Sequence, residues 1–497
     1  MHKLKLLLVS LLACVCVSQA ATYYVAMDGD DARTGLDWAN ALATIGKAVS
    51  KASSGTGDTV LVSNGTYTLT KQIAISAAMT VRSVNGPEFT FVNGNYPNTT
   101  NRCFYISYPS VSAVIDGFTI TNGYAAGNYG GAIYMLNGGL IRNCVISSNY
   151  AAGRGGGVFM TGTCIVENCV IVSNRTDNYG AGVHFDGAGG VLRDSTIGWN
   201  NGPNGGILAY IGGSCLVSNC TIIGNYASNH GAGIGLMTPD NLVVDCRIIN
   251  NTATKHGGGI YIEKNGNTIA SCSIISNSGG VGGGFYMVGN NNTVVVQNCA
   301  IMDNTATTSG GGGVFSASGT HWIRNCLIKG NKSITTSYGG AVYSGKDGST
   351  CTVQNCTIVS NDAPTGHGGG AYSYSGWLYL ENCIMTSNTA GNAARPEWDK
   401  YDANSVISFT NCLIWSAQTT ELAGTGNITN QPPRFVDESA GQYQLAKESP
   451  CINTGINQDW MSTAVDLDGR SRLDRFSRLV DMGCYEYVPS GAMFSCY

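Results

Sequence analysis

The chain has 497 residues, of which 43% are hydrophobic and 12% are charged, so it is neither a disordered polymer nor an ordinary highly charged soluble domain. Its 68 glycines follow no strict Gly-X-Y period, which excludes collagen. The net charge of −4 argues against a non-specific nucleic-acid binder, which needs a basic surface, and against electrostatic docking on anionic lipid.

Residues 1–20 have the three parts of a secretory signal peptide. Lys3 and Lys5 give a positive start, an apolar run reaches Val17, and Ser18-Gln19-Ala20 approximates a cleavage site. We therefore expect cleavage after Ala20 and a secreted or cell-surface protein. Leu11-Leu12-Ala13-Cys14 also resembles a lipobox, which makes a lipoprotein anchored through Cys14 the alternative. No later segment is apolar over the ~18 residues that a membrane span needs.

Residues 21–70 differ from the rest of the chain and predict an amino-terminal cap. Tyr23-Tyr24-Val25 indicates a strand, residues 44–52 an amphipathic helix, and the run from Gly57 to Val62 a strand that begins the first coil. Solenoids need such a cover, because the apolar core is otherwise open at the end of the stack.

A repeat of about 27 residues fills residues 71–415. Each unit has three short β-patterns and no helical pattern, which predicts one coil of a right-handed parallel β-helix with three strands per coil. About 13 coils spaced by about 4.8 Å would give a rod on the order of 60 Å long, in which neighbouring coils bury one another's apolar face.

Two residue columns mark the repeat. The first contains Cys144, Cys169, Cys220, Cys246, Cys272, Cys299, Cys326, Cys356, Cys383 and Cys412, with Ser195 in its one gap. The second contains Asn149, Asn174, Asn225, Asn251 or its neighbour, Asn277, Asn304, Asn331, Asn361 and Asn388. We expect the cysteines to be small buried hydrophobes rather than disulfides or zinc ligands, since parallel side chains disfavour an S–S bond and no histidine partners share their spacing. The asparagines predict an amide ladder at a turn that uses their tolerance of left-handed geometry.

Residues 416–497 leave the repeat and contain Ser449 to Gly455, Asp466 to Arg470 and Val480 to Tyr487. These pieces resemble the choice-of-anchor region that closes many bacterial right-handed β-helix proteins of the pectate-lyase-like superfamily. The amino-terminal pieces Tyr24-Val25, Thr34 to Ala41 and Gly65-Thr66-Tyr67 resemble the start of the same proteins, and the repeats are similar to those of chlamydial polymorphic outer-membrane proteins. The resemblance implies the fold, but it does not specify function, because this architecture hosts lyases, hydrolases, adhesins and inert stalks.

The carboxy-terminal pieces raise two further expectations. Cys451 and Cys484 both stand where this region usually has small residues, which predicts a disulfide or a close contact and leaves their redox state open. Asp466, Asp468 and Asp481 are candidate ligands of Ca2+. The favoured interpretation is that these carboxylates brace loops together with Arg470 or Arg472. No other metal or cofactor is expected.

A third column lies in the strand that follows each glycine run, at a position between two inward residues. It is aromatic in seven of ten units, namely Tyr134, Phe159, Tyr261, Tyr286, Phe315, Tyr343 and Tyr372. Two interpretations are open for these rings. One is a strip of exposed rings that binds sugars, because such rings present flat apolar faces with polar edges. The other, slightly favoured, is an aromatic ladder that only stabilises the stacked strands.

A fourth column, four residues before the inward aliphatic residue, contains Arg154, His230, His256 and His367 among its members. His184, His230, Lys255, His256 and Glu263 form a candidate catalytic patch. A polyuronide lyase needs a cation or metal beside the substrate carboxylate and a base for the adjacent proton, and these residue types are present. The alternative is a hydrogen-bonding ladder at a tight turn.

The sequence therefore predicts a single all-β parallel β-helix that is exported and displayed at the cell surface. The favoured function is a monomeric, non-catalytic rod that binds a polysaccharide or cell-surface glycan, or that acts like an adhesin. The alternative is a polysaccharide lyase that acts on uronic-acid-containing polymers. The sequence does not name the glycan or the means of surface retention.

Overall fold

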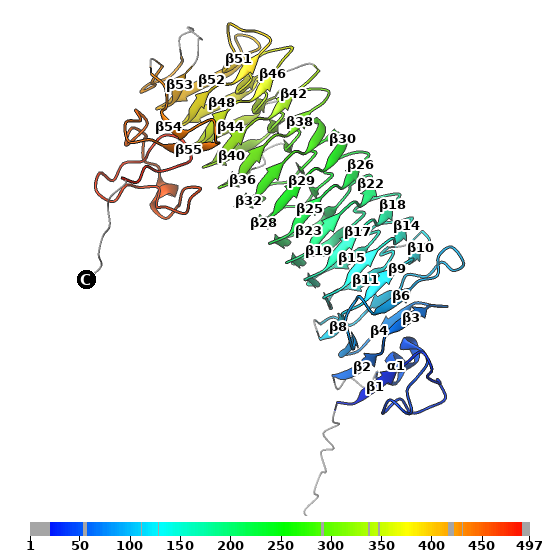
Figure 1. Ribbon diagram of the computed structural model, residues 1–497. Helices are drawn as coiled ribbons and strands as arrows, with labels where there is room; N and C mark the ends of the chain where they lie inside the picture. Colours follow the sequence, from blue (N-terminus) through cyan, green and yellow to red (C-terminus); the bar gives the residue numbers. More distant parts are fainter. Residues whose placement is uncertain are drawn as a thin grey trace, which may run out of the picture.

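The computed structural model describes residues 20–52, 57–110, 112–127, 129–289, 293–335, 338–345, 348–415, 422–429 and 431–489. The chain forms a curved rod of stacked coils, with the amino-terminal elements at one end and the carboxy-terminal region beside the other (Figure 1). Its strands confirm the expected all-β parallel β-helix of about 13 coils. The expected signal peptide and Cys14 lie outside the described residues, of which Ala20 is the first.

Four sheets run along the rod. The first two coils pass through sheets A, B and C, and from β8 (Ala113–Asp116) onward the chain passes through the sheets in the order A, B, D and C. Sheet A has 15 strands: β1 (Thr22–Val25), β2 (Asp58–Val62), β5 (Met79–Ser83), β8 (Ala113–Asp116), β12 (Leu140–Arg142), β16 (Ile165–Glu167), β20 (Val191–Arg193), β24 (Leu216–Ser218), β28 (Leu242–Val244), β32 (Thr268–Ala270), β36 (Thr293–Gln297), β40 (Thr320–Arg324), β44 (Thr350–Gln354), β48 (Trp377–Glu381) and β52 (Val406–Thr410). Sheet B has 14 strands: β3 (Gly65–Thr68), β6 (Thr90–Asn93), β9 (Thr119–Thr121), β13 (Val145–Ser147), β17 (Val170–Val172), β21 (Thr196–Gly198), β25 (Thr221–Ile223), β29 (Arg247–Ile249), β33 (Ser273–Ile275), β37 (Ala300–Met302), β41 (Leu327–Lys329), β45 (Thr357–Val359), β49 (Ile384–Thr386) and β53 (Leu413–Trp415).

Sheet C has 13 strands: β4 (Ile73–Ile75), β7 (Phe104–Ile106), β11 (Ile133–Leu136), β15 (Val158–Thr161), β19 (Val183–Ala188), β23 (Ile207–Gly213), β27 (Ile234–Leu236), β31 (Ile260–Ile262), β35 (Phe285–Met287), β39 (Val314–Ser316), β43 (Val342–Ser344), β47 (Ala371–Ser373) and β51 (Trp398–Lys400). Sheet D has 11 short strands: β10 (Tyr124–Ala125), β14 (Tyr150–Ala151), β18 (Arg175–Thr176), β22 (Asn201–Gly202), β26 (Tyr226–Ala227), β30 (Thr252–His256), β34 (Ser278–Val281), β38 (Thr305–Ala306), β42 (Lys332–Ser333), β46 (Asp362–Ala363) and β50 (Thr389–Ala390). The sequence predicted three strands per coil and missed those of sheet D. Most of these strands have only two residues, which is too short for an alternating pattern to be detected.

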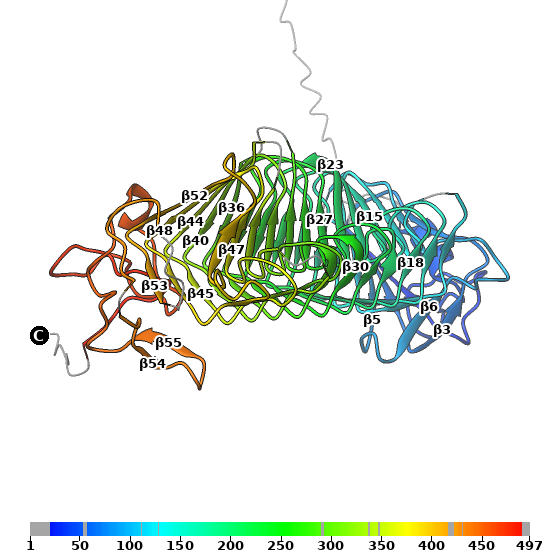
Figure 2. The same cartoon turned by 90° about the horizontal axis from the view of Figure 1, so that it is seen from above.

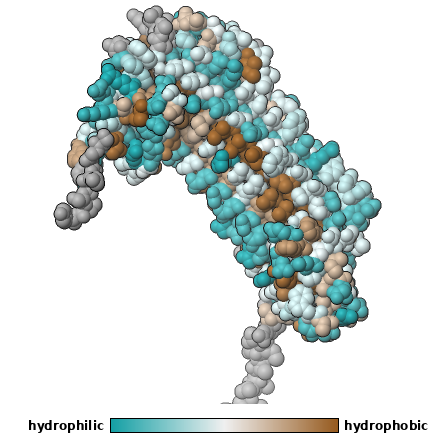
Figure 3. Space-filling model, viewed as in Figure 1, coloured by the Kyte–Doolittle hydropathy of each residue, from teal (hydrophilic) through white to brown (hydrophobic). Residues whose placement is uncertain are grey.

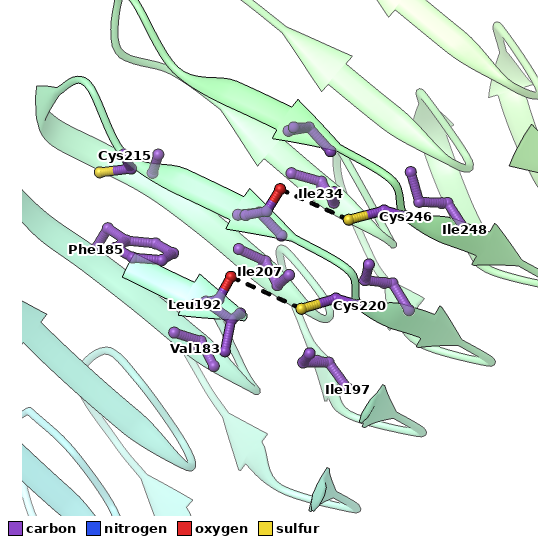
Figure 4. Close-up of a cluster of buried hydrophobic side chains, with 14 of the residues drawn as sticks. Val183, Phe185, Leu192, Ile197, Ile207, Cys215, Cys220, Ile234, Cys246 and Ile248 are labelled. Carbon is purple, nitrogen blue, oxygen red and sulfur yellow. Dashed lines mark hydrogen bonds between the residues drawn. The ribbon is translucent and has the colours of Figure 1, made fainter. Parts of the chain in front are cut away.

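The cysteine column points into the apolar core, as predicted. Figure 4 shows Cys220 and Cys246 among inward aliphatic residues such as Ile197 and Ile248, with the Cys220 thiol 3.8 Å from the carbonyl oxygen of Leu192. Every cysteine in the described part of the chain is buried and free. Burial disfavours the thiolate and raises the pKa of Cys351 to about 12. These thiols therefore act as small core residues.

The predicted amide ladder runs through ten coils and lies between sheets B and D. Its members are Asn149, Asn174, Asn200, Asn225, Asn251, Asn277, Asn304, Asn331, Asn361 and Asn388. Asn251 shows the pattern: its backbone N–H and its Nδ2 both donate to Asn277 Oδ1, at 3.0 and 2.9 Å, and Nδ2 also donates to the Ile222 carbonyl. The prediction of left-handed geometry was wrong for these asparagines. The preceding residue adopts it instead, as Ser148 does with a φ of 57°, so that the amide remains free to bridge coils.

A buried carboxylate ends the ladder. Glu397 Oε1 and Oε2 accept hydrogen bonds from the backbone N–H and the Nδ2 of Asn388, at 3.3 and 2.6 Å. Glu397 is fully buried, and this burial raises its pKa from 4.5 to about 8.

The amino-terminal helix α1 (Ile45–Lys51) confirms the predicted cap helix. Thr44 Oγ1 accepts the Lys47 N–H and begins the helix, and Ile45, Ala48 and Val49 are buried in the core cluster of the rod. Within the described ranges, no helix is long and apolar enough to cross a membrane.

Residues 422–428 of the carboxy-terminal region hydrogen-bond to the last two strands of the rod, β52 and β53, whereas residues 431–489 pack against its side. The region's antiparallel strands β54 (Phe435–Asp437) and β55 (Gln442–Leu445) lie near β53 in both views (Figures 1 and 2). A 3-10 helix, η1 (Asp459–Ser462), follows. Two small clusters join this region to sheet B, one through Ile384 and Leu413 and one through Leu327 and Val359.

Cys451 and Cys484 of this region do not form the disulfide that the sequence predicts as one possibility. Both are free, and they pack in different clusters, so the predicted disulfide is wrong. Because the region spreads along several coils, Cys451 lies with residues of β49 and β53, whereas Cys484 lies with residues of β41 and β45.

We expect Asn251→Ala to lower the stability of the folded rod by on the order of 3 kcal/mol, because each buried group that loses its partner costs roughly 1–3 kcal/mol. The midpoint of urea unfolding, followed by circular dichroism, measures this loss. Thr252→Ala, at the exposed next position, is the control and should leave the midpoint unchanged. An unchanged midpoint in Asn251→Ala would contradict a stabilising ladder.

We expect the stability of the protein to fall as the pH rises from about 4.5 to about 8, partly because of Glu397. In this window the unfolded chain has lost the Glu397 proton while the folded protein retains it, so deprotonation favours unfolding. Glu397→Gln, whose neutral side chain keeps an acceptor for Asn388, should flatten this part of the pH profile of the free energy of unfolding. Parallel profiles for the two proteins would show that Glu397 does not titrate abnormally.

Candidate functional site

The outer face of sheet C carries a column of stacked rings, which we call the ring column. Strand pairing aligns Tyr105, Tyr134, Phe159, His184, Leu208, Gly235, Tyr261, Tyr286, Phe315, Tyr343, Tyr372 and Asp399 in successive coils. From Tyr261 to Tyr343 the ring planes are nearly parallel, with centroids 5.2 Å apart for Tyr286 and Phe315 and 4.5 Å apart for Phe315 and Tyr343. In-register parallel strands impose this spacing, because equivalent side chains repeat at about 4.8 Å.

A second column lies on the glycine-rich turn between sheets D and C, and we call it the turn column. It contains Tyr129, Arg154, Tyr179, His230, His256, Tyr338 and His367. Its rings stack on those of the ring column one coil further on: His256 lies 4.3 Å from Tyr286, and Tyr338 lies 4.7 Å from Tyr372. The two columns thus form a double stack.

The double stack corrects the prediction of an open strip of seven rings. Phe159, Tyr261, Tyr343 and Tyr372 are between 1% and 8% exposed, because turn-column and neighbouring rings cover them. Tyr134, Tyr286 and Phe315 remain half-buried and keep part of their surface open. The open aromatic surface is therefore smaller than expected, and Tyr129 of the turn column, 37% exposed, adds to it.

His184 lies in the ring column and is completely buried. Its Nε2 is 3.3 Å from Asp186 Oδ1, and Arg154 Nη1 is 3.2 Å from the same oxygen. Burial lowers the pKa of His184, so its imidazole is neutral and serves as a hydrogen-bonding partner of Asp186. Tyr210 covers this group, with its ring 4.5 Å from the Arg154 guanidinium.

Tyr210 is a residue that sequence analysis missed. Phe185 pairs with Ala209 and Asp186 with Ile211, so Tyr210 is the extra residue of a β-bulge between β19 and β23. A bulge breaks the repeat that revealed the other columns.

His230 and His256 stack on each other with their ring centroids 4.8 Å apart. Burial lowers the pKa of both, to about 4 for His256, and the charge of Lys255 lowers them further. At neutral pH both rings are uncharged, which permits close stacking without repulsion. They behave as members of the turn column rather than as cations for a substrate carboxylate.

The five residues of the predicted catalytic patch therefore do not line one open groove. His184 lies two coils before the coil of His230, a spacing of roughly 10 Å. Lys255 is exposed, and Glu263 forms an ion pair with Lys264 at 2.8 Å. The spacing of the repeat predicts which residues share a column. It does not predict which side chains in that column are buried and which are exposed.

A more compact charged cluster lies at the carboxy-terminal end of the two columns. His367 Nδ1 is 2.7 Å from Asp399 Oδ2, and Arg395 Nη1 is 2.7 Å from Asp399 Oδ1. Asn392 Nδ2 lies 3.3 Å from both His367 Nδ1 and Asp399 Oδ2. The Asp399 side chain is 4% exposed, whereas that of His367 is 42% exposed, so a buried carboxylate orients an open imidazole.

Sequence analysis placed His367 in the turn column but missed Asp399 and Arg395. Asp399 occupies the ring-column position after Tyr372. In the ten units that the sequence identified, glycines precede the strand of sheet C, but here Arg395-Pro396-Glu397 stands in their place. The sequence pattern therefore identified the ring column only as far as Tyr372 and missed the last coil.

The carboxylates of the carboxy-terminal region brace loops, as the favoured interpretation predicted. Asp466 accepts hydrogen bonds from the backbone N–H groups of Asp468, Arg470 and Glu486, and Asp481 accepts those of Asn453 and Tyr487. Arg472 is completely buried and pairs with Glu486 at 3.0 Å. Within the described residues, no group of three or more His, Cys, Asp or Glu side chains is arranged to hold a metal ion.

The repeats match the family model "Right handed beta helix region" over residues 131–301 and 181–348. No curated protein sequence matches the chain. Three similar solved structures are the pectate lyase Pel9A, the PL6 family alginate lyase AlyGC and the GH87 alpha-1,3-glucanase from Streptomyces thermodiastaticus strain HF3-3.

The pectate lyase is 14% identical, with a TM-score of 0.36 over 94% of this chain and 97% of that one. The alginate lyase is 14% identical, with a TM-score of 0.45 over 86% and 56%. The glucanase is 15% identical, with a TM-score of 0.35 over 62% and 63%. At these identities and TM-scores, the activities of the three enzymes are not transferred to this chain.

Proposed function

Residues 131–348 form a right-handed β-helix region, and we propose that the rod binds glycans along the outer face of sheet C without cleaving them. The observation that carries this proposal is the unbroken run of rings from Tyr261 to Tyr372, in which Tyr286 and Phe315 keep part of their surface open. Aromatic rings with one open side offer flat apolar surface and polar edges, which suits the faces and hydroxyls of sugar rings.

Cations beside the open rings favour an acidic glycan. The guanidinium of Arg102 lies over the rings of Tyr105 and Tyr134, at 5.8 and 5.3 Å from their centroids. Among the described residues Arg102 has no carboxylate within ion-pair distance. It is therefore available to a uronate or another anionic group on a sugar that stacks against Tyr134.

The neutral, buried histidines support a binding role rather than catalysis. His184 is inaccessible to a polymer, and His256 with a pKa of about 4 is a weak base. The signal-like residues 1–20 support export, and we propose that the rod acts outside the cell or at its surface.

We expect the double variant Tyr286→Ala/Phe315→Ala to weaken glycan binding by roughly tenfold or more, which corresponds to about 1.4 kcal/mol. Affinity electrophoresis through gels that contain polygalacturonate, alginate or xylan measures the dissociation constant. Trp377→Ala is the matched control, since this ring is 47% exposed on sheet A. Equal retention of the double variant and the wild type would contradict binding at sheet C, and so would an absence of wild-type retention on every polymer.

The open His367 supports a second candidate function, a polysaccharide lyase whose base is His367 rather than the predicted central patch. Asp399 holds Nδ1, so that Nε2 faces outward as the proton acceptor. In a β-elimination, Nε2 takes the proton next to the uronate carboxylate, the electron pair forms the new C=C bond, and the C–O bond to the leaving sugar breaks. The imidazolium then gives its proton to the leaving oxygen, while Arg395 lies close enough to orient the carboxylate.

If the protein is a lyase, we expect His367→Ala to abolish the appearance of unsaturated uronate absorbance from polygalacturonate or alginate. Asp399→Asn should lower kcat more than it changes KM, because this residue positions the base and does not bind the sugar. His256→Ala serves as the control and should retain the rate. Loss of activity in His256→Ala but not in His367→Ala would restore the central patch and exclude this assignment.

A further inference from the structure

A hollow of about 340 Å³ lies at the amino-terminal end of the rod and is lined by Trp38, Ser63, Asn64, Val84 and Asn85. We propose that it binds a single neutral pyranose unit. The hollow is formed by the cap loop and by the two turns that connect β2 to β3 and β5 to β6. These turns join sheet A to sheet B, so the hollow is distinct from the outer face of sheet C and does not depend on glycan binding there.

Trp38 supplies an aromatic platform. Its side chain is 45% exposed, although it belongs to a folded loop. Its ring rests edge-on against Tyr24 of β1, with centroids 4.7 Å apart and planes at 67°. Asp37 accepts the backbone N–H of Asn40 at 2.8 Å and holds the loop around it. A large ring fixed from one side, with its other surface open, fits the apolar face of a sugar ring.

Asn64 and Asn85 supply a hydrogen-bonding pair in the same hollow. Asn85 Nδ2 donates to Asn64 Oδ1 at 2.8 Å, which orients both amides. This bond leaves Asn64 Nδ2 as a donor and Asn85 Oδ1 as an acceptor, and neither has a protein partner within the described ranges. Adjacent sugar hydroxyls each donate and accept, so one donor and one acceptor side by side match a pair of them.

The lining of the hollow selects for a neutral ligand. Among the residues that the structure describes, no charged side chain lines it, and Val84, 39% exposed, adds apolar surface beside the indole. Its volume is at the lower end of the range for small-molecule sites, which suits one sugar unit rather than a polymer chain. A uronate would find no cation there to compensate its charge.

The experiment is a titration of the full chain with glucose, galactose, mannose and xylose, with galacturonate as the charged comparison. Ligand-observed saturation-transfer NMR and indole fluorescence report binding. We expect saturable binding of at least one neutral sugar and none of galacturonate. Trp38→Ala and Asn85→Leu should each weaken it by roughly tenfold or more.

Three further variants keep the result interpretable. Trp199→Ala removes another exposed indole, 58% exposed, and should leave binding unchanged. Tyr286→Ala/Phe315→Ala should also leave it unchanged, which separates this site from sheet C. Trp38→Phe retains a ring and should bind more strongly than Trp38→Ala, which excludes simple misfolding of the cap. Absence of saturable binding by every neutral sugar, or full binding by Trp38→Ala, would overturn the proposal and leave the amide pair as a brace between two turns.

Discussion

The amide ladder between sheets B and D is the constraint on which the other features of the rod depend. Each interior asparagine uses Nδ2 for two bonds, to a carbonyl of one coil and to the amide oxygen of the next, as Asn251 does with Ile222 and Asn277. A shift by one residue in any coil would leave these buried groups unpaired, at a cost of roughly 1–3 kcal/mol each. The ladder therefore holds successive coils in register, and the cysteine and ring columns follow from that register. Asn200 shows that it continues through the unit in which serine replaces the column cysteine.

The double stack on sheet C connects stability to the proposed function. Rings such as Tyr372, 2% exposed, contribute to stacking between coils and have little surface left for a ligand. Tyr134, Tyr286 and Phe315 each contact a neighbouring ring and also keep part of their surface open. Open aromatic surface therefore remains at a few positions rather than along the whole column.

Sheet B carries a different kind of surface. In each of the last coils it presents an apolar outward residue, namely Leu327, Val359, Ile384 or Leu413, and the carboxy-terminal region covers these residues. Arg472 strengthens this attachment with a bond from Nη1 to Asn325 Oδ1 in the turn between β40 and β41. Apolar residues continue along the same face of the rod beyond this cover (Figure 3). Three residues of sheet B, Ile223, Ile249 and Ile275, are half-buried.

The sequence by itself determined the coil, its stacking, the inward cysteines, the amide ladder and the cap helix. All of these follow from residues that recur at a fixed spacing or from local helical periodicity. It also identified which aromatic residues share a column, because in-register parallel strands place equal positions on top of one another. The exposure of the predicted site residues was anticipated less well: Tyr286 and Phe315 keep open surface, whereas His184 is buried and Asp399 was missed.

Only the tertiary structure decided how the columns lie relative to one another. The turn column covers Tyr261 and Tyr372 because the glycine-rich turn folds back over sheet C, and no spacing within one column contains that information. Asp399 contacts His367 from a coil that lacks the glycine run of the preceding units. Tyr210 lies on the outer face of sheet C because a β-bulge inserts it there. The carboxy-terminal region has no repeat, so nothing in its sequence places it beside sheet B; the apolar outward residues of the last coils determine that position, because they are buried only when this region covers them.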